Sequence, residues 1–112
     1  MTKLIITSNH RTFTVYDLEK KQEIFIKEKD DNLDCIGMTS KGRPTFRPFG
    51  VTSDEEFIYI ASNEKLGVYD KKTYEFVKIL DVPLFINTHE ILKVGDVLYV
   101  CNTSTDTIGI YN

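Results

Sequence analysis

The sequence predicts an all-β fold built from repeated, four-stranded antiparallel sheets. Seven Phe, six Tyr and many β-branched residues dominate the apolar set of this 112-residue chain, and these residue types favour strands. Short apolar runs alternate with turns rich in Asp, Asn, Ser and Lys, which punctuate hairpins. The length suits one small domain, which we expect to cover residues 1–112.

Two short sequence units recur along the chain. The first is an apolar strand that reads LIITSN at 4–9, FIYIASN at 57–63 and VLYVCNT at 97–103. The second reads TVYD at 14–17, GVYD at 67–70 and GIYN at 109–112. The last two copies are separated by the length of a propeller blade, about 40–50 residues. The first two are further apart, which predicts an insertion between them.

The middle unit, residues 47–82, predicts one complete blade of a β-propeller. Its four strands are expected at 49–52, 57–61, 67–69 and 75–80. The strand at 57–61 reads FIYIA and does not alternate between apolar and polar residues. A sheet with one wet face shows a period of two, whereas a sheet covered on both faces does not. We therefore expect neighbouring sheets on both faces of this blade, as in a propeller ring.

The flanking units are shorter. Strands are expected at 4–8, 13–16 and 23–27 in blade one (1–30), and at 89–93, 97–101 and 107–111 in incomplete blade three (83–112). The chain thus predicts about three blades and ten strands. The outer faces of the end blades are rich in Ile, Val, Tyr and Phe, and their exposure would create a large apolar patch. Ring completion by a second chain, a homodimer or the product of another gene, removes that patch.

Residues 31–46 form the predicted insertion. The stretch at 33–39 could add one short strand, and otherwise the segment is a loop over one face of the ring. Loops longer than about 12–15 residues are usually functional or disordered.

A family resemblance rests on the segment RPFGVTSDEEFIYIASNEKLGVYDKKT. It contains a PxG-like start of the inner strand, an acidic turn, an apolar strand and a GVYD strand, and HEILKVGDVLYVCNTSTDTIGIYN repeats the pattern. Through these motifs, residues 47–112 resemble the six-bladed propellers of the NHL, YVTN and SMP-30-like superfamily. The resemblance implies a ring of six blade positions, filled here by two chains, and says little about activity. The metal ligands of the lactonases among such propellers do not match this chain residue by residue.

Propellers place their sites around the central axis, where the inner strands begin. His89 and Glu90 lie at such a start, and His89 could serve as a general base, a metal ligand or a hydrogen-bonded residue of the channel wall. Arg43 and Arg47 could clamp a carboxylate or phosphate, or pair with acids of the 30–34 segment. The predicted ligand-binding residues are His89, Glu90, Asn87, Arg47 and Arg43.

Composition excludes several classes of function. A formal net charge of -3 argues against nucleic acid as a partner. The longest apolar runs fall far short of the roughly 18 residues of a membrane span, so we expect no membrane partner. Cys35 and Cys101 are too few for a disulfide framework and indicate thiols in a reducing cytoplasm. Asp30, Asp31 and Asp34 lack the glycine and glutamate of a calcium loop.

Two functions remain open from the sequence. The first is a binding or scaffold module that forms a homo-oligomer and holds a small ligand or peptide in the central channel. The second is a hydrolase or lyase, similar to the lactonases, that acts at the channel mouth near His89 and Glu90. No cofactor is expected for the first, and a divalent metal is possible for the second. The sequence contains no nucleophile or phosphate-binding motif that would identify an enzyme. It therefore does not decide between the two functions.

Overall fold

The computed structural model describes residues 2–8, 11–28, 36–38, 44–46, 50–61, 65–81, 88–102 and 107–111. These residues form strands and turns, with no helix among them, so the all-β prediction is confirmed. Twelve strands occur in this part of the chain, two more than predicted. They are β1 (Lys3–Ser8), β2 (Arg11–Asp17), β3 (Gln22–Glu28), β4 (Ile36–Met38), β5 (Pro44–Phe46), β6 (Gly50–Ser53), β7 (Phe57–Ala61), β8 (Lys65–Asp70), β9 (Phe76–Asp81), β10 (Thr88–Val94), β11 (Val97–Asn102) and β12 (Thr107–Tyr111).

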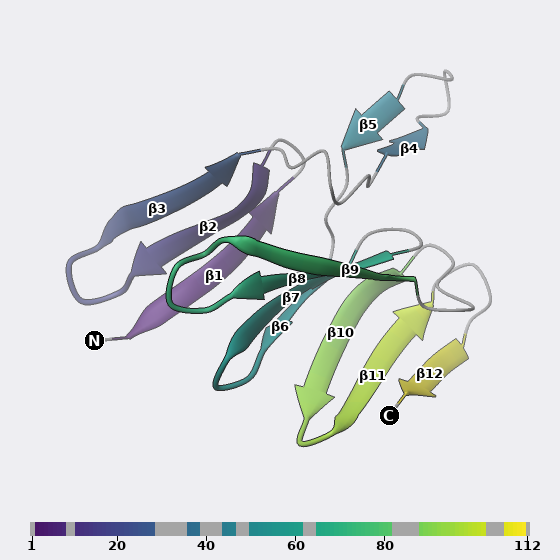
Figure 1. Ribbon diagram of the computed structural model, residues 1–112. Helices are drawn as coiled ribbons and strands as arrows, with labels where there is room; N and C mark the ends of the chain where they lie inside the picture. The colour runs from purple at the N-terminus through teal and green to yellow at the C-terminus, as the bar shows by residue number, and fades with distance from the viewer. Residues whose placement is uncertain are drawn as a thin grey trace.

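Three antiparallel, blade-like sheets make up most of the fold (Figure 1). We call them the N-sheet (β1–β3), the middle sheet (β6–β9) and the C-sheet (β10–β12). In each sheet, strands that follow one another in the chain are hydrogen-bonded neighbours. The middle sheet has the four strands predicted for the complete blade, and the N-sheet and C-sheet have three each.

The two additional strands come from the predicted insertion. The sequence suggested one short strand at 33–39, but the structure has a hairpin of two strands. In it β4 pairs with β5, with Ile36 opposite Phe46 and Met38 opposite Pro44. Strand β5 escaped prediction because it is very short and begins with Pro44, a residue that demotes a strand assignment. The hairpin lies at the end of the sheets where β6 and β10 begin, away from the turns that follow these strands (Figure 1).

The middle sheet is covered on both faces, as its unbroken apolar strand predicted. Ile58 and Ile60 of β7 pack in one core cluster with Phe13 and Val15 of the N-sheet. The intervening residue, Tyr59, packs instead against a second cluster, formed by the middle sheet and the C-sheet. Side chains alternate between the two faces of a strand, so alternate residues of β7 pack into two different cores. For this reason β7 carries apolar residues at every position.

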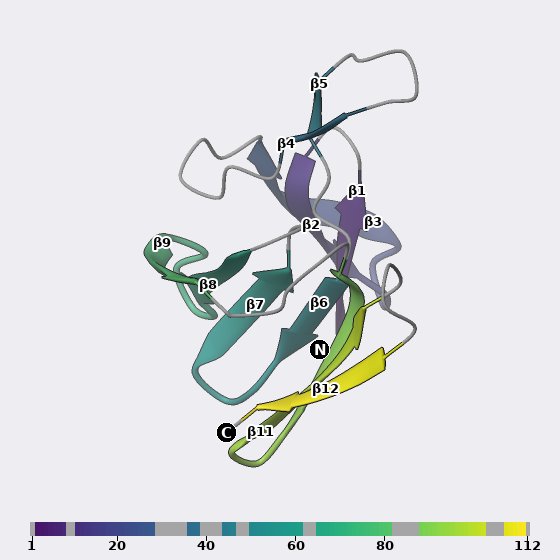
Figure 2. The same ribbon diagram turned by 90° about the vertical axis from the view of Figure 1, so that its right-hand side faces the viewer.

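The strands β1, β6 and β10 bring the three sheets together. Strand β6 contacts both β1 and β10, which are the first strands of the other two sheets. Figure 2 shows these strands side by side near the centre, with the later strands spreading outward. The first strand of the middle sheet therefore contacts the first strands of both other sheets.

The repeat seen in the sequence is also a repeat of strand register. The tyrosine of the second unit pairs with an aliphatic residue of the first unit in all three sheets. These cross-strand pairs are Leu4–Tyr16, Ile58–Tyr69 and Leu98–Tyr111. Directly opposite residues share one face of a sheet, so each pair marks an equivalent face in its sheet.

The repeated aspartate of the second unit closes a turn. The Oδ1 atom of Asp17 accepts hydrogen bonds from the backbone amides two and three residues further on, at 2.9 and 3.1 Å. Asp70 does the same at 2.7 and 2.9 Å, and these backbone hydrogen bonds lower its pKa. Four residues after each aspartate, Lys21 and Tyr74 adopt positive φ angles of 55° and 65°. The aspartate thus has a structural role in the repeat.

Candidate functional site

A hollow of about 720 Å³ lies between the turn that joins β6 to β7 and the turn that joins β10 to β11. Its lining combines four acids, two lysines and two aromatic rings with small residues. The lining residues are Ser53, Asp54, Glu55, Glu56, Phe57, Tyr59, Lys71, Lys93, Gly95 and Asp96. The hollow is therefore where charged side chains of two neighbouring sheets converge in the described part of the chain.

Asp54 lines this hollow and accepts the hydrogen bonds of the turn in which it lies. Its Oδ1 atom accepts the backbone amides of Glu56 and Phe57, both at 2.8 Å, which is an Asx-type turn. Its Oδ2 atom accepts the hydroxyl group of Tyr59 at 2.7 Å and lies 3.0 Å from the ammonium nitrogen of Lys93. The carboxylate therefore has four donors, which matches its acceptor capacity.

The electrostatics of the cluster fix both protonation states. Burial raises the pKa of Asp54, but the hydrogen bonds from Tyr59, the Phe57 amide and Lys93 outweigh it, and the net pKa lies well below its ordinary value. Burial and the hydrogen bond to Asp54 raise the pKa of Tyr59 well above its ordinary value. Near neutral pH, Asp54 is therefore a carboxylate and Tyr59 a neutral phenol, so neither is prepared to transfer a proton.

Lys93 connects the two turns that border the hollow. Its ammonium group donates to the carbonyl oxygen of Gly95 at 2.6 Å and lies 5.7 Å from the centroid of the Tyr59 ring. Its backbone amide donates to Oγ1 of Thr52 in β6 at 3.1 Å. These contacts hold β10 against the middle sheet, so the cluster is a structural connection between sheets.

The sequence did not reveal this cluster. An aspartate in an acidic turn before an apolar strand predicts an Asx turn. Its partner Lys93 lies in another repeat unit, and no local pattern connects the two. Only the packing of the C-sheet on the middle sheet brings the two charges together.

The predicted ligand-binding residues fall mostly outside the described part of the chain. Arg43, Arg47 and Asn87 lie outside it, and so does the side chain of His89, whose backbone belongs to β10. Glu90 is described: it is exposed and pairs with Cys101 across β10 and β11. This site at the start of β10 stays a prediction, and it lies at the opposite end of that strand from the Asp54 hollow.

The described residues contain no group of three or more His, Cys, Asp or Glu side chains that could hold a metal ion. The acidic segment with Asp30, Asp31 and Asp34 lies outside this part of the chain. Among the same described residues, no helix is long and apolar enough to cross a membrane.

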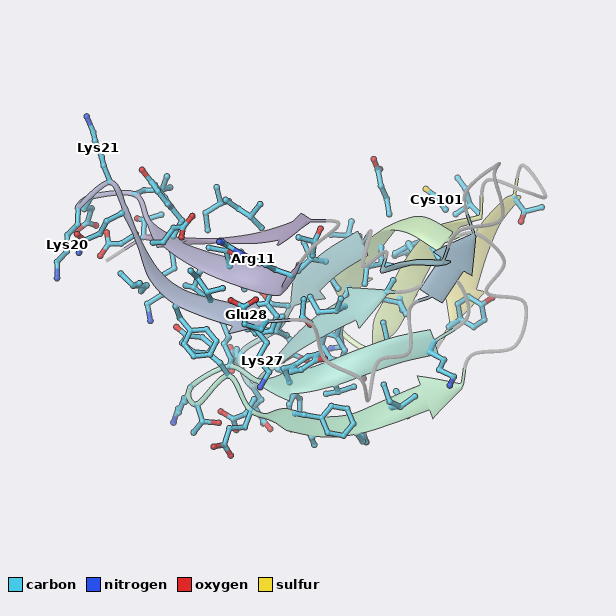
Figure 3. The ribbon with its side chains drawn as sticks, turned by 90° about the horizontal axis from the view of Figure 1, so that it is seen from above. Arg11, Lys20, Lys21, Lys27, Glu28 and Cys101 are labelled. Carbon is cyan, nitrogen blue, oxygen red and sulfur yellow. The ribbon has the colours of Figure 1, made fainter. Side chains whose placement is uncertain are left out.

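The outer face of the C-sheet is an exposed apolar surface in the described part of the chain. Its side chains come from all three strands of the sheet, and between 40 and 69% of each is exposed. They are Leu92, Val94, Tyr99, Ile108 and Ile110. Cys101 is exposed on the same face, and Figure 3 shows its side chain projecting away from the middle sheet.

The outer face of the N-sheet is a second exposed apolar surface. Leu4 and Ile6 of β1 are 46 and 43% exposed, whereas Ile5 between them packs into the core shared with the middle sheet. Tyr16, opposite Leu4, is half-buried. Both ends of the row of sheets therefore present apolar side chains to solvent.

Neither a model of a known protein family nor a curated protein matches the sequence. The fold and the surfaces described above define the class: an all-β chain of stacked, blade-like antiparallel sheets with an uncovered apolar face at each end of the stack.

Proposed function

We propose that this chain is a binding or scaffold module of the β-propeller type that works as a homo-oligomer. The observation that carries the proposal is the pair of exposed apolar faces on the N-sheet and the C-sheet. Burial of apolar surface is worth roughly 25 cal/mol per Å², and monomers rarely leave large contiguous apolar patches in water. Association that covers both faces is therefore strongly favoured.

A six-bladed ring of the NHL, YVTN and SMP-30-like type is the assembly we propose. Three blade-like sheets per chain give six in a dimer, and closure of a ring removes both free faces. Such a ring surrounds a central channel, where a small ligand or a peptide would bind near the starts of the inner strands. Its contacts would come from His89, Glu90, Asn87, Arg47 and Arg43.

The alternative function, a hydrolase or lyase, depends on His89 and Glu90. The Asp54 carboxylate does not strengthen it, because its oxygen atoms are already engaged by four donors. The binding module is therefore the function that the described residues support better.

The molar mass in solution tests the proposal. Light scattering coupled to size exclusion is expected to give about twice the chain mass of 12.9 kDa. Dilution to the point of dissociation is expected to increase the binding of a hydrophobic dye, because the apolar faces become free. A monodisperse monomer that binds no dye at any concentration would contradict the proposal.

A further inference from the structure

Each of the three sheets has two distinct faces, which the register defines. The face that carries the aliphatic–tyrosine pair is called the tail face. The opposite face of the same sheet is called the head face. The tail pairs are Leu4–Tyr16 in the N-sheet, Ile58–Tyr69 in the middle sheet and Leu98–Tyr111 in the C-sheet.

The first interface inside the chain joins a head face to a tail face. Ile5 and Val15 are cross-strand partners on the head face of the N-sheet. Both pack in one core with the tail pair Ile58 and Tyr69 of the middle sheet.

The second interface repeats this arrangement in the same direction. Tyr59 and Ala61 belong to the head face of the middle sheet, and they pack in one core with Val100, Leu98 and Tyr111 on the tail face of the C-sheet. Two successive interfaces thus use the same polarity, head to tail.

The faces left uncovered are the two that this pattern still requires. The N-sheet has a free tail face, with Leu4, Ile6 and Tyr16. The C-sheet has a free head face, where Tyr99 pairs with Leu92 on one side and with Ile110 on the other. The stack therefore ends in two complementary surfaces, and neither is a copy of the other.

We propose that a second copy of this chain docks head to tail, with the C-sheet head face of one copy on the N-sheet tail face of the other. This inference rests on the proposed self-association and specifies which surfaces meet. It continues the two interfaces already present inside the chain. A two-fold axis makes the two contacts identical and closes the assembly.

The internal interfaces predict how completely the exposed tail-face residues of the N-sheet become buried when a second copy docks. Ile58 and Ile60 are fully buried on the middle-sheet tail face. Leu4 and Ile6 hold the equivalent positions and are 46 and 43% exposed. Docking of a head face is expected to bury Leu4 and Ile6 to the same degree as their equivalents.

The same equivalence predicts one specific intermolecular neighbour. Ala61 on a head face belongs to the same core cluster as Val100 on the tail face that covers it. In the repeat, Cys101 corresponds to Ala61 and Ile6 corresponds to Val100. Cys101 of one copy should therefore lie close to Ile6 of the other.

Two single-face charge variants test the polarity. Leu4→Glu damages only the tail face and Ile110→Lys only the head face, at side chains that are 46 and 66% exposed. In head-to-tail docking each variant alone is expected to run as a monomer. An equimolar mixture recovers the dimer, because one interface is native and the other pairs Glu with Lys. Val77→Glu, at a residue of the middle sheet that is 45% exposed, is the matched control and should stay dimeric.

The results separate this inference from the proposed function. If the wild-type chain is a monomer, self-association itself fails. If the wild type is a dimer but Leu4→Glu is equally dimeric, or the mixture stays monomeric, only the head-to-tail arrangement is overturned. Circular dichroism of each variant confirms that a monomeric mass comes from a folded chain.

Thiol cross-linking provides a second, independent test. In a Cys35→Ser background, Ile6→Cys is expected to be joined to Cys101 of another copy by a short bismaleimide, which gives a covalent dimer on a denaturing gel. The matched control is Ile5→Cys, which places the thiol in the internal core. No more covalent dimer from Ile6→Cys than from Ile5→Cys would overturn the inference.

Discussion

The ammonium nitrogen of Lys93 lies 3.0 Å from Oδ2 of Asp54 and thereby joins turns from two different sheets. The same carboxylate accepts the Tyr59 hydroxyl group at 2.7 Å. Both charged side chains are less than one third exposed, at 22 and 27%, so solvent screens their attraction only in part. This connection adds a polar link to the apolar core that packs the C-sheet on the middle sheet.

Replacement of Lys93 is expected to weaken that packing. Lys93→Met keeps the apolar stem but removes the ammonium group, so Asp54 loses one donor and the Gly95 carbonyl loses another. We expect a loss of about 1–2 kcal/mol in the free energy of unfolding, measured by urea denaturation. Lys20→Met, at an exposed turn residue, is the control and should change stability by less than about 0.5 kcal/mol. Equal effects of the two variants would contradict the structural role of Lys93.

Tyr59→Phe should show how much the hydroxyl group contributes to stability apart from the ring. The ring keeps its place beside the core between the middle sheet and the C-sheet, but Asp54 loses its shortest side-chain donor. We expect a loss of about 1–3 kcal/mol, as for a hydrogen bond to a charged group. Phe57→Leu serves as a comparison, because Phe57 lines the same hollow without donating a side-chain hydrogen bond to the carboxylate. An unchanged unfolding midpoint for Tyr59→Phe would contradict the prediction.

The stability contribution of Asp54 should depend on pH in a defined direction. Its folded-state pKa lies below the ordinary value of 3.8, so its contribution is complete above that value and is lost as the pH falls through it toward the folded-state pKa. We expect Asp54→Asn to be less stable than the wild type at pH 7, with a difference that shrinks at pH 3. Urea midpoints at pH 7, 5 and 3 measure this difference. A difference that stays constant with pH would show that the charge does not stabilise the fold.

The two turn aspartates should respond differently to truncation. Asp17 is 1% exposed and accepts two backbone amides in a part-buried turn, so Asp17→Ala removes the acceptor of both amides and is expected to cost about 1–3 kcal/mol. Asp70 makes equivalent bonds at a more exposed position, and water can replace them in Asp70→Ala. Thermal unfolding of both variants shows which substitution costs more stability, and we expect it to be Asp17→Ala. Asp17→Asn is the control, because it retains an acceptor. A larger effect at Asp70 would contradict it.

The core between the N-sheet and the middle sheet should be the most sensitive part of the described chain. Ile60 is fully buried there, so Ile60→Ala is expected to destabilise the fold by about 2–5 kcal/mol through lost contacts and a cavity. Val77→Ala is the control, because Val77 is 45% exposed and its truncation opens no enclosed cavity. Chemical denaturation of both variants measures the contrast, and similar midpoints would be inconsistent with the packing described here.

The sequence predicted most strands because their signals are local. The run FIYIA and the repeated Tyr-Asp units set the positions of β7 and β8 through residue types that favour strands and turns. The same run also indicated that the middle sheet is covered on both faces, since a half-exposed strand alternates. The hairpin of β4 and β5 was only partly foreseen, because a three-residue strand that begins with proline carries almost no pattern.

By itself, the sequence determined the all-β class, the three sheet-forming units and the aspartate turns of the repeat, because hydrophobic period and turn chemistry act over a few residues. Only the tertiary structure decided that Lys93 meets Asp54 and that the N-sheet, the middle sheet and the C-sheet stack with the same head-to-tail polarity. These relationships join residues of different repeat units. Their cause is the mutual burial of two sheet faces, which spacing along the chain does not encode.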